Sequence, residues 1–187
     1  TGKTTLCRAF LETLDNTYEA AYIFNPKLNS LQLIKAINDE FGISSDSDDA
    51  KVLTDALNSF LMEKRAEGKK VILVIDEAQN LYFPTLEEIR VLSNLETEKE
   101  KLLQIILMGQ VELKEKLSLP RLRQLNQRIS VRYHLQTLGK EEVPRYIQHR
   151  LTVAGSSGDI YFTSSALREI YSYSQGIPRL INLAADR

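Results

Sequence analysis

The 187-residue sequence predicts a three-layer α/β fold, with a parallel sheet between helices, followed by a small all-helical domain. A continuous and mostly β-branched run at residues 71–75 is typical of a strand covered on both faces, as in parallel sheets. Strand-like and helix-like segments alternate around this run, which favours parallel strands joined by crossover helices. After residue 135 only helical spacing remains. We therefore expect one domain at 1–136, a second at 137–187 and a hinge near 136–139.

Each element is placed by its apolar spacing and by the residues that end it. Gly42 and Gly68 should end the second and third helices, and Thr85 with Glu88 forms a capping box for the fourth. The expected order is a helix through about residue 14, a strand at 18–24, helices marked by 31–41 and 53–61, strand 71–75, a helix at 85–95, strand 102–108, an edge strand at 129–135, and three helices at about 140–153, 164–174 and from 178 onward.

Composition excludes several classes of protein. The 24 basic and 25 acidic side chains leave a net charge of −1, which excludes a chain-wide cationic surface for nucleic acid or anionic lipid. The one cysteine, Cys7, cannot form an internal disulfide and should pack in the first helix. No apolar run is long enough to cross a bilayer. His134 and His149 lack partners at metal-ligand spacing. The acidic run at 46–49 should cap the helix after it, and four aromatic residues should lie in the core: Tyr18, Tyr22, Phe24 and Phe41.

The first candidate site is the segment Gly2-Lys3-Thr4, which matches the second half of the phosphate-binding pattern G-x-x-x-x-G-K-[ST]. In such loops the backbone N–H groups at a helix N-terminus surround the phosphates. The lysine reaches the β- and γ-oxygens, and the hydroxyl binds Mg²⁺. The half motif alone also fits an ordinary helix start that happens to carry a lysine.

The second candidate site is the pair Asp76-Glu77, which follows the buried strand 71–75. Ligands bind outside the carboxyl ends of parallel strands, so Asp76 is placed to hold Mg²⁺ and Glu77 to deprotonate an attacking water. Taken alone, the pair also fits an acidic loop that ends a strand. Its position downstream of a Gly-Lys-Thr helix favours the nucleotide interpretation, because the two motifs are mechanically linked and in the right order.

Three further residues are weaker candidates. Gln110 follows strand 102–108 and would lie near the γ-phosphate if that strand neighbours 71–75; otherwise it is a surface glutamine. Arg128, with Arg123 as second choice, could reach the γ-phosphate of a neighbouring subunit, or belong to a solvated basic face. Arg179 follows Gly-Ile-Pro at the start of the last helix, where it could face a nucleotide or simply be exposed.

Together these segments resemble the AAA+ ATPases, and among them the general secretion pathway protein A type. The matching segments are Gly2-Lys3-Thr4-Thr5, Asp76-Glu77-Ala78-Gln79-Asn80-Leu81, Gly109-Gln110, Leu125-Asn126-Gln127-Arg128-Ile129 and Gly176-Ile177-Pro178-Arg179-Leu180-Ile181-Asn182. The resemblance implies a five-stranded core with a helical lid, and ATP and Mg²⁺ as cofactors. The implied site residues are Gly2, Lys3, Thr4 and Thr5 (Walker A), Asp76 and Glu77 (Walker B), Gln110 (sensor 1), Arg128 (arginine finger) and Arg179 (sensor 2).

The same resemblance implies ring-like homo-oligomers that act with components of an envelope secretion or export system, as the cytoplasmic domain of an inner-membrane-associated bacterial protein. Two alternatives stay open: a transposition-helper ATPase that binds DNA, which the near-neutral charge disfavours, and a nucleotide-gated scaffold with little catalysis. A helicase is weaker still. The family pattern needs a strand and the first half of the phosphate loop before Gly2. We therefore expect the chain to be a fragment that lacks the first strand and binds ATP poorly.

Overall fold

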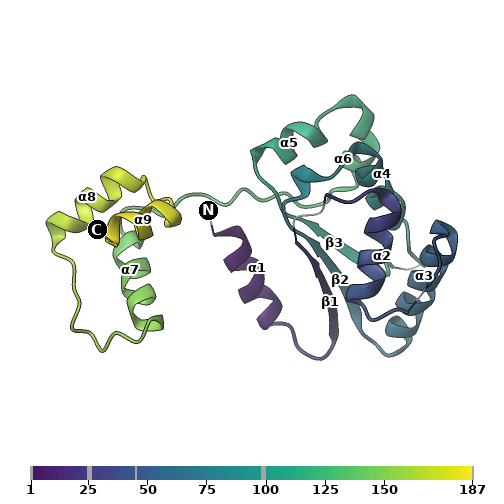
Figure 1. Cartoon of the computed structure of the whole chain (residues 1–187), viewed down its shortest axis with the longest axis horizontal. Helices are drawn as coiled ribbons and strands as arrows, with labels where there is room; N and C mark the ends of the chain where they lie inside the picture. Colours follow the sequence, from purple (N-terminus) through teal and green to yellow (C-terminus); the bar gives the residue numbers. More distant parts are fainter. Residues whose placement is uncertain (1, 25–26, 45, 98–99, 187) are drawn as a thin grey trace. The chain divides into compact units, whose positions relative to one another are not determined.

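The computed structural model describes residues 2–24, 27–44, 46–97 and 100–186, and divides into two compact units (Figure 1). One unit is Leu6–Arg132 and the other joins Thr1–Thr5 to Tyr133–Arg187. The expected boundary between residues 136 and 137 stays a prediction. Within the described residues, no helix has both the length and the apolar character needed to span a membrane.

Three parallel strands form the sheet of the larger unit. They are β1 (Tyr18–Ile23), β2 (Lys70–Ile75) and β3 (Leu103–Leu107), in the spatial order β1-β2-β3. Leu73 is paired with Ala21 on one side and with Ile105 on the other. Every residue of β2 after Lys70 is buried, as the apolar run predicted. The predicted parallel sheet, with a strand at 71–75 covered on both faces, is therefore confirmed.

Helices cover both faces of this sheet. Ile72 and Val74 point to one face and pack against Cys7 of α1 (Lys3–Glu12), so the predicted packing role of Cys7 is confirmed. Residues on the other face join a larger apolar core with α2 (Ser30–Glu40), α3 (Ala50–Ala66) and α4 (Phe83–Leu92). Figure 1 shows α1 on one side of the strands and α2 with α3 on the other. The alternation along β2 thus produces the predicted three layers.

Local side chains cap some of the described helices. The side chain of Asp49 accepts a hydrogen bond from the backbone of Lys51 at 2.7 Å and caps α3, as the acidic run predicted. The predicted capping box of Thr85 with Glu88 is wrong. Helix α4 begins after Tyr82, and the hydroxyl of the buried Thr85 donates instead to the carbonyl of Leu28 at 3.0 Å. The Thr85 hydroxyl thus bonds to a carbonyl distant in the sequence instead of capping its own helix.

The predicted edge strand at 129–135 is also wrong. After β3 come α5 (Val111–Leu117), the short 3₁₀ turn η2 (Pro120–Leu122) and α6 (Arg123–Arg128), and residues 129–139 then have no regular structure. Val131 and Tyr133 are 83% and 84% exposed. A strand needs a partner for its backbone groups. Among the described strands β3 pairs with β2 alone, and the described sheet has three strands, one fewer than the four expected for a five-stranded core without its first strand.

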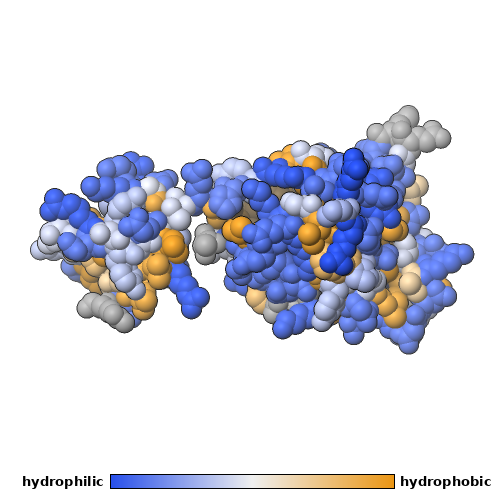
Figure 2. Space-filling model, turned by 90° about the horizontal axis from the view of Figure 1, so that it is seen from above, coloured by the Kyte–Doolittle hydropathy of each residue, from blue (hydrophilic) through white to orange (hydrophobic). Residues whose placement is uncertain are grey.

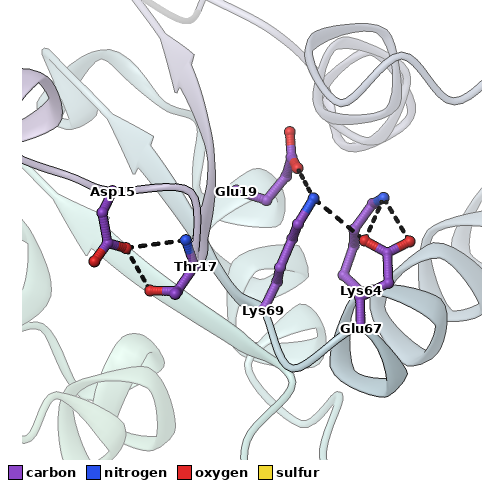
Figure 3. A network of polar contacts seen from close by, with 6 residues as sticks. All are labelled: Asp15, Thr17, Glu19, Lys64, Glu67 and Lys69. Carbon is purple, nitrogen blue, oxygen red and sulfur yellow. Dashed lines mark hydrogen bonds and ion pairs between the residues drawn. The ribbon is translucent and has the colours of Figure 1, made fainter.

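Polar contacts gather at the amino ends of β1 and β2 (Figure 3). Asp15 accepts hydrogen bonds from the backbone and hydroxyl of Thr17 at 2.9 and 2.5 Å, just before β1. Lys69 lies between Glu19 and Glu67, with Nζ to carboxylate distances of 3.8 and 3.2 Å. Hydrogen bonds from Lys64 and then Lys69 lower the pKa of Glu67. Because Asp76 follows the opposite ends of the strands, this network has a structural role away from the candidate site.

Three helices pack together in the smaller unit, as predicted: α7 (Glu142–Val153), α8 (Ser164–Ser174) and α9 (Pro178–Ala185). Their small core is formed by Val143, Ile147, Ile170 and Ile181. Gly176, between α8 and α9, has φ +74, and a Cβ there would lie 1.9 Å from the carbonyl oxygen of Leu138. The backbone N–H of Leu138 donates to the carbonyl of Gly176 at 2.9 Å. Only glycine permits this close crossing of two backbone segments.

Hydrophilic residues dominate the face of the molecule seen in Figure 2, and hydrophobic residues form small groups among them. The exposed large hydrophobic residues of the smaller unit include Ile160, Tyr161, Tyr173 and Leu183. Scattered apolar side chains are ordinary on folded domains, so we assign these residues no function.

Candidate functional site

Asp76 directly follows the last residue of β2 and is completely buried. Its Oδ2 accepts a hydrogen bond from the hydroxyl of Tyr22 at 2.8 Å, and its Oδ1 accepts one from the backbone N–H of Glu77 at 2.8 Å. The Asp76 backbone N–H donates to the carbonyl of Ile23 at 2.9 Å. These contacts fix the orientation of a buried carboxylate at the carboxyl edge of the sheet.

Tyr22 was expected to be a plain core residue, but its hydroxyl is a polar partner of Asp76. Burial, followed by the hydrogen bond to Asp76, raises the pKa of Tyr22 to about 12. Burial and the charge of Asp76 also raise the pKa of the Cys7 thiol. Near pH 7 the Tyr22 hydroxyl and the Cys7 thiol are therefore both neutral. Of the other aromatic residues expected in the core, Phe41 is buried and Tyr18 packs against the sheet, whereas Phe24 is 64% exposed.

Glu77 is held in an unusual backbone conformation, with φ 52 and ψ 35. Left-handed geometry costs a residue with a Cβ about 1–2 kcal/mol and persists where the surroundings enforce it. One carboxylate oxygen, Oε2, accepts hydrogen bonds from Nε2 of Gln79 at 2.6 Å and from Nε2 of Gln110 at 3.1 Å. The strained turn thus presents the Glu77 carboxylate to two amide side chains from different elements.

Gln110 reaches this turn because β3 lies beside β2, which is the arrangement on which its predicted role depended. It precedes α5, and its backbone N–H donates to Oε1 of Gln79 at 3.1 Å. A Cβ at Gly109 would lie only 2.9 Å from that same Oε1 and 2.7 Å from Cδ2 of Leu113, so glycine is needed before Gln110.

Gln79 is a site residue that the sequence reasoning did not single out. It lies in the 3₁₀ turn η1 (Ala78–Asn80), and its amide connects Glu77 to the backbone of Gln110. The available signal was its place in the segment Asp76-Glu77-Ala78-Gln79. That segment matches the family pattern, and nothing in it indicates which way the amide turns.

The amino-terminal residues form the start of α1. Gly2 has φ +88, and Lys3 is the first helical residue; Gly2, Lys3 and Thr4 are partly buried and Thr5 is exposed. Farther along the same helix, Cys7 packs against β2. Lys3 and Thr4 belong to a different compact unit from Asp76, so their convergence with Asp76 on one nucleotide stays a prediction.

The arginines have separate surroundings. Arg128 and Arg123 are the last and first residues of α6, and both are exposed. Arg121 lies over the ring of Phe83, 3.2 Å from its centroid, and Arg132 donates to the backbone and side chain of Asn126 at 2.8 Å. Arg179 is the second residue of α9, is exposed, and belongs to the smaller unit. The roles of Arg128 and Arg179 therefore stay predictions.

The donor chemistry suits Mg²⁺ that is bound together with phosphates. Magnesium in nucleotide sites typically uses one or two protein oxygens, with phosphate oxygens and waters completing the shell. The oriented carboxylate of Asp76 and the hydroxyl of Thr4 are donors of this kind. In the part of the chain that the structure describes, no group of three or more His, Cys, Asp or Glu side chains forms a self-sufficient metal site.

Comparisons with known proteins give the family of the chain. Residues 1–117 match the family model described as "AAA domain". The chain is 47% identical over 188 residues to the general secretion pathway protein A of Aeromonas hydrophila, a match that covers 100% of this chain and 34% of that protein. The chain thus spans about a third of the length of this curated relative.

Solved structures share the fold. The ADP form of the Aeropyrum pernix ORC2 protein superposes with a TM-score of 0.67 at 17% identity, over 96% of this chain and 51% of that one. The Walker-type ATPase PABY2304 of Pyrococcus abyssi superposes with a TM-score of 0.60 at 17% identity, over 98% of this chain and 58% of that one. Cdc6p of Pyrobaculum aerophilum superposes with a TM-score of 0.57 at 19% identity, over 81% of this chain and 40% of that one. At such identities the likeness is one of fold, and it is the α/β fold that the sequence predicted.

Proposed function

The chain belongs to the AAA domain family, and we propose that it binds ATP with Mg²⁺ and hydrolyses it at the carboxyl edge of its sheet. The observation that carries this proposal is the convergence of the buried Asp76, the strained Glu77 and the amide of Gln110 from the next strand. Parallel α/β sheets bind their ligands at this edge. A purely structural acidic turn would not need a left-handed glutamate held by two amides.

Each residue has a role that follows from its chemistry. The Lys3 ammonium and the backbone N–H groups at the start of α1 bind the phosphates, with Gly2 and Thr5 shaping the loop around them. The Thr4 hydroxyl and the Asp76 carboxylate hold Mg²⁺, which neutralises phosphate charge when bound. Glu77 accepts a proton from the attacking water, and Gln110 orients that water.

Two arginines complete the proposed site. Arg128, with Arg123 as the alternative, is exposed on α6 and would reach the γ-phosphate of a neighbouring copy in a homo-oligomer. Arg179 would approach the nucleotide from the helical unit of the same chain. Both assignments rest on residue chemistry and on exposure.

The identity to general secretion pathway protein A supports a biological setting for this activity. We propose that ATP turnover energises or switches the assembly of a bacterial envelope secretion or export system, with the chain on the cytoplasmic side of the inner membrane. A second candidate is a nucleotide-gated scaffold with slow turnover. The observation that favours it is that Gln79 and Gln110 already occupy one oxygen of the Glu77 base.

The protein expressed from its full gene tests the proposal. We expect Lys3→Ala to abolish ATP binding in isothermal titration. Glu77→Gln should keep binding and lower phosphate release by about 10²–10⁴-fold, because it removes the general base. Glu115→Gln, an exposed change on α5, is the matched control. If Glu77→Gln releases phosphate at the parent rate, the assignment of the base is wrong; slow release by the parent itself would favour the scaffold.

A further inference from the structure

Lys116, near the end of α5, directs its ammonium group into the turn that carries the candidate site. Its Nζ donates hydrogen bonds to the carbonyl of Gln79 at 3.0 Å and to the carbonyl of Leu81. The same Nζ lies 5.0 Å from the centroid of the Phe83 ring. None of the ion pairs found among the described residues includes Lys116. Backbone carbonyls thus take the place that a carboxylate usually has beside a lysine.

This position is costly for a lysine. Ammonium groups normally stay in water, and burying one is unfavourable unless its donors are satisfied. Burial, and then the positive charge of Arg121, lowers the pKa of Lys116. Lys114, two residues earlier on the same helix, is exposed. The inward placement of Lys116 is therefore a specific feature of its contacts with the turn.

Those contacts fasten both ends of α5 to one short segment. At the start of α5, the backbone of Gln110 donates to the side chain of Gln79. Near its end, Lys116 donates to the main chain of Gln79 and of Leu81. The side chain of Gln79 also binds Glu77, so the base and the water-orienting amide are both linked to this segment.

We propose that Lys116 is a positioning residue that locks residues 77–81 to α5, so that Glu77 and Gln110 keep a fixed separation during turnover. The proposal rests on the proposed ATPase function. In this proposal Lys116 acts through its hydrogen bonds to the turn and does not itself bind the nucleotide. Its loss should therefore lower kcat and leave the KM for ATP unchanged, whereas a merely structural role would lower stability without this separation of kcat from KM.

The locking itself can be measured without nucleotide, by amide hydrogen exchange on the full chain. We compare Lys116→Met, which keeps an unbranched apolar stem, with Lys114→Met on the exposed side of α5. In Lys116→Met, exchange at residues 78–81 should rise about tenfold, because two carbonyl bonds of the turn are lost. Exchange at 71–75, within β2, should stay at the parent rate, and Lys114→Met should match the parent in both segments.

Turnover is measured on the protein expressed from its full gene. Lys116→Met should lower kcat about tenfold at unchanged KM, and Lys116→Arg should recover most of it, because a guanidinium can donate to both carbonyls. Unchanged exchange in the turn, equal effects of the two methionine variants, or a parent-like kcat in Lys116→Met would each overturn the proposal. If the parent releases no phosphate, the ATPase function and the kcat effect both fail, and the exchange result alone decides whether Lys116 locks the turn.

Discussion

Replacing Tyr22 by phenylalanine removes one hydroxyl and tests whether Asp76 is oriented as described. The hydroxyl donates to Oδ2 of Asp76 at 2.8 Å, and the acceptor is completely buried. A hydrogen bond to a charged group contributes about 1.5–3 kcal/mol, and we take about 2 kcal/mol because Tyr22 itself is only partly buried. For a domain of this length, that loss lowers Tm by about 4–8 °C.

Thermal unfolding followed by circular dichroism measures the effect, and Tyr18→Phe is the matched control. Tyr18 is on the same strand and packs against the same face of the sheet, and Lys70 lies over its ring, which phenylalanine retains. We expect the Tm of Tyr18→Phe to stay within about 1 °C of that of the parent, as is usual for a substitution that removes no hydrogen bond to a buried group. Equal Tm values for the two variants would refute the reasoning about Asp76.

The pH dependence gives the same prediction a second readout. The pKa of Tyr22 is raised to about 12 in the folded chain, against about 10 in an unfolded one. A raised pKa means that Tyr22 keeps its proton to a higher pH in the folded state than in the unfolded state. The stabilisation is therefore complete below pH 10 and is lost as the pH rises towards 12. The stability difference between the parent and Tyr22→Phe should shrink over this range; a constant difference would contradict the assignment.

Three further changes have defined outcomes. Gly176→Ala should destabilise the chain by about 3 kcal/mol in urea unfolding, because its Cβ would lie 1.9 Å from the carbonyl oxygen of Leu138, whereas Gly158→Ala, with nothing within 4 Å, should cost about 1 kcal/mol. Glu77→Gly should be more stable than Glu77→Ala by about 1 kcal/mol, since both lose the carboxylate and only alanine pays for φ 52; equal stability would show that the turn relaxes. Arg128→Ala should lower phosphate release about 10³-fold, and mixing it with Glu77→Gln should restore part of the rate if the arginine acts between subunits; no recovery would exclude that role.

The strand β2 and its acidic end could be predicted because both depend on local pattern. A buried parallel strand needs an uninterrupted apolar run, and residues 71–75 supply it. The chain direction then places Asp76 and Glu77 at the carboxyl edge. The neighbouring position of Gln110 follows from one added assumption, that β3 pairs with β2, and the register confirms this.

The predictions that failed concerned residues whose partners are distant in the sequence. Residues 129–135 alternate like a strand, but alternation does not supply the hydrogen-bonding neighbour that a strand requires, and Val131 and Tyr133 are exposed. Thr85 has the spacing of a helix cap, yet its hydroxyl is bound by a carbonyl 57 residues away. Lys116 and Gln79 are 37 residues apart, and no local pattern indicates that they meet.

The geometry of Glu77 is best understood as a property of its turn. Left-handed backbone at this residue costs about 1–2 kcal/mol. Each hydrogen bond that holds the turn stabilises it by about 0.5–1.5 kcal/mol, and by more where one partner is charged. The turn is held at its start by Asp76 and by a bond of 2.8 Å from the Ala78 N–H to the carbonyl of Met108. Lys116 holds its end. The stabilisation from these bonds together exceeds the cost of the strained backbone. The turn therefore keeps Glu77 in place even when its carboxylate is not hydrogen-bonded to Gln79 and Gln110. The proposed role of Glu77 as a base is compatible with this arrangement, because its carboxylate can exchange its amide partners for a water molecule while the backbone stays fixed.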